Sequence, residues 1–436
     1  MHPGEAFLNE LQDWRGTADF GLEAISTVMA LLGNPHEHVP AIHVAGTNGK
    51  GSTSAMIAAI LGANGSRVGL ASSPHLMRSN ERIVVDGIPV SDEVLYEYAI
   101  SLRSAVERSG CRLSFFEGMV ALAFLIFADW ELEYAVYEVG LGGRLDATNI
   151  VSRPVVSAIT SISLDHTHIL GNCVEDIARE KAGIVKPGVP IVLGEMPDEA
   201  VQEIVRHTDT RQARTYIHTR DYWIDQSGNV QLGCEMVMLP GHWQGTYFAR
   251  NAAVAAMMAK VLALPKRVIE HGFEGVFWPA RLEHISCNDV NWLLDCAHNS
   301  EGAHELVEFI KQSNFKQLHL VYSSLDTKAW QSVLNQLIPH VHTFHLVPVE
   351  SVRAVPQHVI ARYLSGIGVS AIVYQSQQAA IERLSKLRPE NPIVVCGSIY
   401  MVGAFRKCLQ VQERPLWKCY PKIDFAQSYS DLRSLR

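Results

Sequence analysis

The chain has 436 residues, of which 47% are hydrophobic and 19% are charged, and its formal net charge is −8. This length predicts two domains, and the acidic balance without a basic run argues against a surface built to bind nucleic acid or an anionic membrane. The eight cysteines form no C-x-x-C pair, which argues against a zinc ribbon or a disulfide framework. The most apolar run, 119–128, is too short to span a bilayer, and residues 1–15 do not resemble a signal peptide. We therefore expect a cytoplasmic protein with reduced thiols.

The first half of the chain alternates short apolar runs with helical patterns. Helices are predicted at 5–14, 22–32, 55–63, 92–108, 174–182, 247–262 and 266–273, with an apolar helix after Ser114. Strands are predicted at 41–45, 67–71, 134–138, 155–160 and 190–193, with a hairpin arm at 81–87 and short strands between 216 and 239. This order indicates an α/β fold, a doubly wound parallel sheet with helices on both faces.

The second half repeats the rhythm on a smaller scale. Strands are predicted at 292–295, 318–322, 343–346, 371–374 and 393–396, with helical patterns between them. These elements predict a smaller Rossmann-like α/β domain. We place the domains at 1–280 and 281–436, and we expect the weakly patterned tail after Arg414 to be peripheral.

The stretch 41–53 has the order of a phosphate-binding loop: an apolar strand, a Gly-rich turn, Lys50 and two hydroxyl residues ahead of a helix. Glycines allow backbone N–H groups to face phosphates, and the N-terminus of the helix adds partial positive charge. The fit to a strict P-loop is imperfect, because its first glycine would fall at Val44 and Gly51 separates Lys50 from the hydroxyl residues. The alternative is a Gly-rich βα turn without a ligand.

Lys50, Ser73, Glu138 and His166 all lie at or just beyond the end of a predicted strand. Ligands bind at the carboxyl ends of the strands in such sheets, so these separate stretches are expected to converge on one edge. Ser73 and Glu138 offer the hard oxygen atoms that Mg²⁺ prefers. For Glu138 the alternative is a structural acid that caps a loop N–H or pairs with Arg144.

Three other residue patterns have simpler structural alternatives. His166 and His168 have a spacing that can bind zinc, but two ligands are weak evidence. Lys181 can form an ion pair with its neighbour Glu180, and beside a metal ion it could serve only as a carbamate. Cys296 and His298 could form a nucleophile–base pair, which we disfavour because no acid is placed to orient the histidine.

Taken together, the motifs resemble the folylpolyglutamate synthase/dihydrofolate synthase family of the Mur ligase superfamily. They occur in the family's order up to about Arg414 and begin at His43 (HVAGTNGKGST), Ser73 (SPHL), Asn80 (NERI), Ser114 (SFFE), Glu138 (EVGLGGRLDATN), Leu164 (LDHT), Arg179 (REKAGI), Ala249 (ARN), Pro279 (PAR), Asp295 (DCAHN) and Cys396 (CGSI).

The resemblance implies an ATP-dependent ligase. A pteroate or folate carboxylate would attack the γ-phosphate, and the amino group of L-glutamate would then displace phosphate from the acyl phosphate. It implies small-molecule substrates only (dihydropteroate or folates, L-glutamate and ATP), two Mg²⁺ sites and an undetermined monovalent cation. We expect a monomer with neither nucleic acid nor membrane as partner.

The resemblance also implies a role for each site residue. Phosphates would be bound by Gly46, Thr47, Asn48, Gly49, Lys50, Gly51 and Ser52. Magnesium would be held by Ser73 and Glu138 at one site, and by His166 and carbamylated Lys181 at the second. Catalysis would depend on Lys50, His166 and Lys181. Substrate contacts would come from Phe115, Phe116, Leu145, Asp146, Ala147 and His298, and ATP contacts across the domain boundary from Asn251, Arg281 and Asp295.

The chain departs from the family pattern at two positions, with Ala280 where the family often has glycine and Ser300 where it often has proline. Neither change deletes a charged group, although alanine adopts a positive φ less easily than glycine. Three alternatives stay open: a folylpolyglutamate synthase alone, another amide ligase of the superfamily, and a non-catalytic nucleotide-binding relative.

Overall fold

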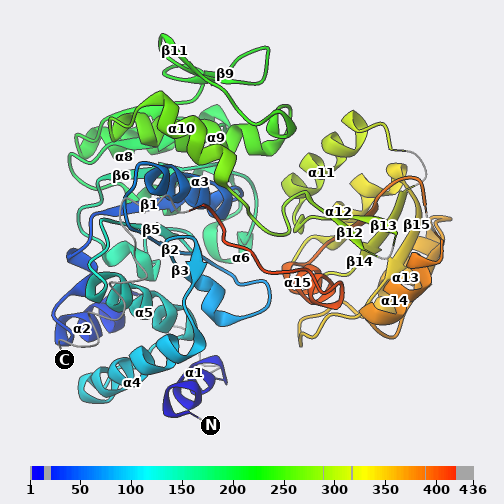
Figure 1. The fold of residues 1–436 in the computed structure, drawn as a ribbon, viewed down its shortest axis with the longest axis horizontal. Coiled ribbons are helices and arrows are strands. Elements are labelled where there is room, and N and C mark those ends of the chain that lie inside the picture. The colour runs from blue at the N-terminus through cyan, green and yellow to red at the C-terminus, as the bar shows by residue number, and fades with distance from the viewer. Residues whose placement is uncertain (1, 14–20, 288, 316–317, 388, 419–436) are drawn as a thin grey trace.

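The computed structural model of this protein describes residues 2–13, 21–287, 289–315, 318–387 and 389–418. It has two α/β lobes that lie side by side, each built on its own sheet (Figure 1). We call the larger lobe, up to residue 276, the N-terminal domain and the smaller lobe, from residue 283 to 409, the C-terminal domain. No helix in these described stretches is long and apolar enough to cross a membrane.

An eight-stranded sheet forms the centre of the N-terminal domain. Its strands in spatial order are β4 (Ile88–Pro89), β3 (Ile83–Val85), β2 (Val68–Ala71), β5 (Tyr134–Glu138), β1 (Ala41–Ala45), β6 (Val156–Ile159), β7 (Ile191–Leu193) and β8 (Thr215–Ile217). Neighbouring strands are parallel across β2, β5, β1, β6, β7 and β8. Strands β3 and β4 add an antiparallel hairpin at one edge. All five residues of β1 are buried, as expected for a central parallel strand covered on both faces. The predicted doubly wound parallel sheet is confirmed.

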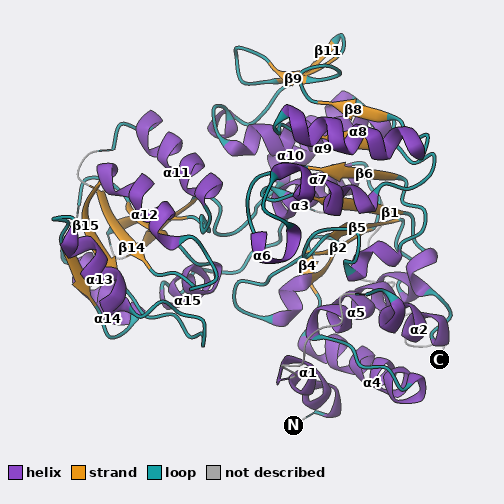
Figure 2. Ribbon diagram, turned by 180° about the vertical axis from the view of Figure 1, so that it is seen from behind, coloured by secondary structure: helices purple, strands orange, loops and turns teal. Residues whose placement is uncertain are grey.

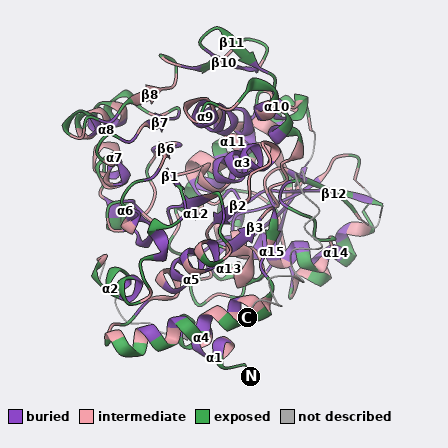
Figure 3. Ribbon diagram, turned by 60° about the vertical axis from the view of Figure 1, so that its left-hand side comes forward, coloured by how far each residue is buried: buried purple, intermediate pink, exposed green. Residues whose placement is uncertain are grey.

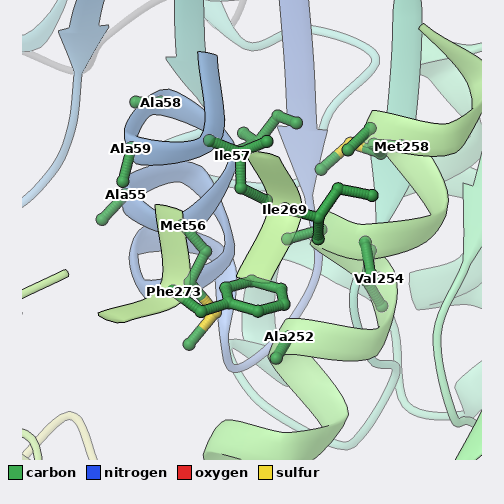
Figure 4. Close-up of a cluster of buried hydrophobic side chains, with 14 of the residues drawn as sticks. Ala55, Met56, Ile57, Ala58, Ala59, Ala252, Val254, Met258, Ile269 and Phe273 are labelled. Atoms are coloured by element: carbon green, nitrogen blue, oxygen red, sulfur yellow. The ribbon is translucent and has the colours of Figure 1, made fainter. Parts of the chain in front are cut away.

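Helices cover both faces of this sheet. The helices of the domain are α1 (Pro3–Asp13), α2 (Glu23–Leu31), α3 (Lys50–Ala63), α4 (Asp92–Ser109), α5 (Phe115–Asp129), α6 (Thr167–Leu170), α7 (Val174–Lys181), α8 (Asp198–Thr210), α9 (Tyr247–Val261) and α10 (Lys266–Gly275). On one face α3 packs between α9 and α10, where Met56 and Ile57 approach Met258, Ile269 and Phe273 (Figure 4). Helices α2, α4 and α5 share a second core on the other face.

Helix α3 is buried on all sides, as its colouring in Figure 3 shows. Its alanine-rich sequence has no polar stripe, because a helix enclosed by a sheet and two other helices has no face toward water. It begins at Lys50 rather than at residue 55, where the sequence pattern placed it. Helix α8 follows β7, in a stretch for which we predicted no element. A separate three-stranded sheet of β9 (Trp223–Ile224), β10 (Val230–Leu232) and β11 (Glu235–Val237) lies beyond α9 (Figure 2).

The C-terminal domain contains a six-stranded sheet. Its strands in spatial order are β12 (Glu283–Cys287), β13 (Val290–Leu294), β17 (Ile393–Cys396), β14 (Leu318–Tyr322), β15 (Val341–Leu346) and β16 (Ala371–Val373). Its helices are α11 (Ser300–Gln312), α12 (Trp330–Leu337), α13 (Gln357–Gly366), α14 (Gln377–Ser385) and α15 (Ile399–Cys408). Two clusters of buried side chains, one on each face, confirm the smaller doubly wound fold.

One strand of this domain was missed by the sequence analysis. The first strand of the domain is β12, which pairs antiparallel with β13. The sequence analysis had placed the first strand at 292–295. Because β12 is an edge strand, several of its side chains are only partly buried, and it lacks the continuous apolar run of the inner strands.

The chain crosses between the domains twice. It leaves the N-terminal domain through residues 276–282 and returns through residues 410–418, the red segment that runs back toward α3 in Figure 1. The two crossings are joined where the Phe277 N–H donates to the Leu416 carbonyl at 2.7 Å. Leu416 and Trp417 are buried in the N-terminal core, and the indole of Trp417 lies against Gly62 of α3. The prediction of a peripheral tail is therefore wrong for these residues, while 419–436 lie outside the described residues.

Candidate active site

A cavity of about 870 Å³ lies between the two domains, at the carboxyl ends of β1, β5 and β6. It is lined by every residue that the sequence analysis assigned to phosphate, metal or ATP, namely Gly46, Thr47, Asn48, Gly49, Lys50, Gly51, Ser52, Ser73, Glu138, His166, Lys181, Asn251, Arg281 and Asp295, and also by His298. The structure thus brings together stretches that are far apart in the chain. The roles of the individual residues stay predictions.

Two glycines give the loop after β1 its shape. Gly46 has φ 148° and Gly49 has φ 80°, both in the region that favours glycine. A Cβ atom at Gly46 would lie 1.9 Å from Oγ1 of Thr160, and one at Gly49 would lie 2.1 Å from Oδ1 of Asn251. Helix α3 starts directly after Gly49, and the residues of its first turn line the cavity, where their N–H groups form a cradle with the geometry that suits an anion.

Lys50 and Glu138 are the charged groups at the base of this cradle. The Lys50 ammonium donates to the carbonyls of Gly46 and Thr47, both at 3.0 Å. Burial lowers the pKa of Lys50, and the charge of Glu138 opposes that effect. Burial likewise raises the pKa of Glu138, and Lys50 opposes it. The two charges therefore stabilise each other in a site that water solvates poorly.

Glu138 also fixes the loop that carries Ser73. Its Oε2 accepts a hydrogen bond from the Ser73 N–H at 3.0 Å. The predicted alternative, in which Glu138 caps a loop N–H, is therefore confirmed. Pairing of Glu138 with Arg144 is wrong, because Arg144 bonds to Glu180 instead. Ser73 and Glu138 both line the cavity and supply the hydroxyl and carboxylate oxygens that suit a hard cation.

The chemistry of this donor set suits a hard divalent cation. The described part of the chain contains no cluster of three or more His, Cys, Asp or Glu side chains that could hold a metal ion without other ligands. Mg²⁺ characteristically takes one or two protein carboxylates and completes its shell with phosphate oxygens and water. The residues present therefore fit an ion that arrives with a nucleotide.

Lys181, near the end of α7, is almost completely buried, and its ammonium donates to the Gly46 carbonyl at 2.8 Å. Burial, aided by the nearby charge of Lys50, lowers its pKa to about 7. An ion pair with Glu180 is wrong, since Glu180 accepts from Arg144 at 2.9 Å. A lysine with this pKa is largely a neutral amine at slightly alkaline pH, the form that can add to carbon dioxide.

His166 follows Asp165 at the start of the short helix α6, with φ 51°. Burial, together with the charge of Lys328, lowers the pKa of His166 to about 4, so the ring is neutral. His168 is exposed, with its ring centre 6.2 Å from that of His166. Among the described residues no third ligand completes a zinc site with this pair.

The interdomain wall of the cavity is held in place by Asp295. Its carboxylate accepts hydrogen bonds from the Tyr247 hydroxyl at 2.8 Å and from the N–H groups of Leu282 and Ala297 at 3.0 and 2.8 Å. Burial raises the pKa of Asp295, and the charge of Arg281 opposes that effect. Asp295 therefore connects the end of β13 to the linker and to α9 in the N-terminal domain.

Ala280, one of the two departures from the family pattern, is buried and has φ 54°. The backbone here has the conformation that glycine adopts most easily, so alanine carries a local strain of roughly 1 kcal/mol. At the second departure, Ser300 begins α11 and Asn299 caps it by accepting from the Gly302 N–H at 2.8 Å. This cap sets the start of the helix without a proline.

The structure gives no support to a Cys296 nucleophile. Burial raises the pKa of the Cys296 thiol to about 11, so the reactive thiolate is scarce. The ring of His298 is hydrogen-bonded through Nδ1 to the backbone carbonyl of Cys296 at 2.8 Å. His298 itself lines the cavity, and burial lowers its pKa to about 4.

The residues predicted to contact the pterin do not line this cavity; they are Phe115, Phe116, Leu145, Asp146 and Ala147. Asp146 accepts four hydrogen bonds: from the N–H groups of Gly140, Leu141 and Thr148 at 2.9 to 3.0 Å, and from the Thr148 hydroxyl at 2.5 Å. Phe116 lies against Gly140, where a Cβ atom would approach its ring to 2.5 Å. Asp146 and Phe116 thus support the loop after Glu138 from behind, and substrate contact by the group stays a prediction.

Several lining residues were missed from the sequence. Tyr247, Arg250 and Lys328 line the cavity but were given no role in the sequence analysis, although Arg250 lies within the ARN motif. Lys328 lies in the loop after β14, so the rule that ligands bind beyond strand ends could have indicated it. Tyr247 and Arg250 lie on α9, where Arg250 is the middle residue of the ARN motif, from which only Asn251 was assigned to ATP, and no pattern in the sequence marked Tyr247.

A glycine cradle on one domain, facing charged residues of a second domain across a cavity, defines a nucleotide-dependent enzyme that works between two α/β domains. The family model described as "Mur ligase, glutamate ligase domain" matches residues 280–399. The folylpolyglutamate synthase of Lacticaseibacillus casei is 34% identical over 412 residues, which cover 88% of this chain and 93% of that protein.

Solved structures are similar over most of the chain. Escherichia coli FolC in complex with DHPP and ADP has a TM-score of 0.83 and 29% identity, and the match covers 94% of this chain and 98% of that one. A bifunctional folylpolyglutamate synthase/dihydrofolate synthase with Mn, AMPPNP and L-glutamate bound has a TM-score of 0.84 and 32% identity, with the same coverage. The chain belongs to the folylpolyglutamate synthase/dihydrofolate synthase family, which are ATP-dependent amide ligases of the Mur ligase type.

Proposed function

We propose that this protein is an ATP-dependent ligase that joins L-glutamate to dihydropteroate, to folates, or to both, through an acyl phosphate. The observation that carries the proposal is that one interdomain cavity is lined by Lys50, Glu138, His166 and Lys181 and by Arg281 from the linker. The DHPP, ADP, AMPPNP and L-glutamate named for the two similar structures support the same substrates here.

The cradle would bind the phosphates of ATP. Two of the three Lys50 protons are bonded to loop carbonyls, so the third is free for the terminal phosphate. The first-turn N–H groups of α3 add donors that need no rearrangement when the nucleotide binds. Asn251, Arg281 and Asp295 would contact the nucleotide from the interdomain side.

Ser73 and Glu138 would hold one Mg²⁺, and His166 and Lys181 would hold a second. When bound, Mg²⁺ neutralises charge that develops on the transferred phosphoryl group. Lys181 can serve as a ligand only after its ammonium loses one proton and the neutral amine adds to carbon dioxide with loss of a second proton, which leaves a carbamate anion. The low pKa of Lys181 supports this modification, since the neutral amine exists near neutral pH.

The chemistry then proceeds by two displacements. The substrate carboxylate attacks the γ-phosphate and ADP leaves, and the glutamate amine attacks the acyl carbon and phosphate leaves. Most of the rate enhancement would come from holding the reactants together in a cavity closed by both domains. Phe115, Phe116, Leu145, Asp146 and Ala147 would shape or contact the pterin site, and His298 would contact substrate on the C-terminal side.

The test is phosphate release by the purified protein with ATP, Mg²⁺ and L-glutamate, comparing dihydropteroate with tetrahydrofolate. Release that requires glutamate and either pterin substrate supports the ligase. Activity with both substrates makes the enzyme bifunctional, and activity with tetrahydrofolate alone makes it a folylpolyglutamate synthase. ATP binding without glutamate-dependent release from any pterin substrate would reject the proposal.

A further inference from the structure

Lys328 is a residue of the C-terminal domain that reaches into the N-terminal domain's part of the site. Its Nζ lies 2.9 and 3.0 Å from the two carboxylate oxygens of Asp165 and 3.2 Å from Nε2 of His166. The side chains of Lys328 and Asp165 are only 12% and 14% exposed. This contact is therefore a built interdomain ion pair and not a flexible surface pair.

The contact to His166 has a fixed direction. A lysine ammonium has only donors, so Nε2 of His166 is the acceptor in this 3.2 Å contact and uses its lone pair. The same lone pair is the one that His166 would offer to a divalent cation. One lone pair serves one partner at a time, so the ammonium and a cation cannot both occupy it.

Asp165, the residue that holds Lys328 in place, connects this competition to the position of the domains. Asp165 also accepts from the Asn299 amide at 3.0 Å, so two groups of the C-terminal domain meet on the residue that precedes His166. The hydrogen bonds of Asp165 to both groups therefore keep Lys328 beside His166.

We propose that Lys328 is a positioning residue that competes with the divalent cation for Nε2 of His166, so that the cation enters this site only when the C-terminal domain withdraws Lys328. The inference rests on the metal role of His166 in the proposed function. Because coupling is reciprocal, a bound cation in turn disfavours the domain arrangement that places Lys328 on His166. Lys328 also disfavours cation binding by charge repulsion, since it adds positive charge to a site that already contains Lys50.

The test is a Mn²⁺ titration of the full-length protein in bicarbonate buffer without nucleotide, followed by electron paramagnetic resonance. The relevant site is the one that His166→Ala removes. Lys328→Gln is expected to bind Mn²⁺ at this site roughly tenfold more tightly than the wild type, a size typical of coupled sites. Lys328→Arg retains the cation and is expected to match the wild type.

Two further measurements separate competition from a structural effect. The nitrogen modulation of the Mn²⁺ echo signal reports the bound imidazole directly, and at equal, limiting Mn²⁺ it should be stronger in Lys328→Gln than in the wild type. Lys311→Gln removes one charge from an exposed pair with Glu308 in the same domain and should change neither readout. Lys328→Met is a second neutral variant, in case the glutamine protein does not fold.

The possible outcomes of the Mn²⁺ titration separate the competition by Lys328 from the metal role of His166. Equal or weaker Mn²⁺ affinity in both folded neutral variants, at a site that His166→Ala removes, would overturn the competition and leave the metal site standing. A site that is absent from the wild type and from both neutral variants would overturn the metal role of His166 itself. Glutamate-dependent phosphate release decides the ligase activity separately.

Discussion

Replacing Lys181 should change stability and activity in opposite directions. The pKa of Lys181 is about 7, against 10.5 for an ordinary lysine, and the cause is burial. That difference corresponds to about 5 kcal/mol of free energy, an upper figure because buried groups relax. Lys181→Met keeps an apolar side chain of similar length in the site and removes the buried ammonium, so the variant is expected to be more stable than the wild type at pH 6 and inactive in phosphate release.

The stability difference between Lys181→Met and the wild type should depend on pH, and its direction follows from the pKa of Lys181. Below pH 7 Lys181 is charged in the folded and the unfolded protein, so the folded state carries the whole cost of burying the ammonium. Between pH 7 and 10.5 the folded amine is neutral while the unfolded one is charged, so the unfolded state binds more protons and wild-type stability rises with pH. The advantage of Lys181→Met should therefore shrink by up to about 1.4 kcal/mol for each pH unit above 7.

The assay is urea unfolding in carbon dioxide-free buffer at pH 6, 7, 8 and 9, followed by circular dichroism, with attention to the transition of the N-terminal domain. Removing carbon dioxide matters because a carbamate would stabilise the folded wild type. Lys311→Met, at an exposed lysine, should give a difference from the wild type that does not vary with pH. A constant difference between Lys181→Met and the wild type across this range would refute the reasoning from the buried ammonium.

Three further predictions concern other parts of the molecule. Lys50→Ala should lower phosphate release at least about a hundredfold while the protein stays folded, because a donor aimed at the transferred phosphate is lost; an unchanged rate in a coupled phosphate assay would contradict its assignment. Asp146→Asn should lower the free energy of unfolding by about 2 kcal/mol, since one oxygen that accepts buried hydrogen bonds becomes an NH₂ group that faces donors; a thermal melt checks this. Trp417→Ala should destabilise the N-terminal domain by about 3 kcal/mol or more, because it removes a side chain that is 1% exposed. Val352→Ala, at a site that is 83% exposed, is the control and should stay within about 0.5 kcal/mol of the wild type.

The sequence predicted elements and site residues best where the residue pattern of a segment matches its burial in the fold. The strand before the phosphate loop is buried on both sides and lacks polar positions, so its apolar run marks it clearly. The acids and hydroxyl residues after such strands were expected at one edge of the sheet, and Lys50, Ser73 and Glu138 do line one cavity. Parallel topology alone produces that convergence, because it places every strand end on the same side.

Other features could not be read from the sequence because they depend on distant contacts. Lys328 and His166 are 162 positions apart, and nothing local to either residue indicates the other. The start of α3 was placed too late, because Gly51, Ser52 and Thr53 have weak helix propensity and their helical state is imposed by packing against α9 and α10. The short apolar pattern around Trp417 is too small to predict a core position, since its partner Gly62 lies in the N-terminal domain, far away in the sequence.

The return of the chain through residues 410–418 has a consequence for biosynthesis. Leu416 and Trp417 complete the core of a domain whose other parts are made first, so that domain cannot finish folding on the ribosome before the second domain has been synthesised. Until then the face of α3 around Gly62, the helix whose first turn forms the phosphate cradle, lacks the indole that covers it. A nonsense mutation anywhere in the C-terminal domain would therefore also remove Leu416 and Trp417 from the core of the N-terminal domain.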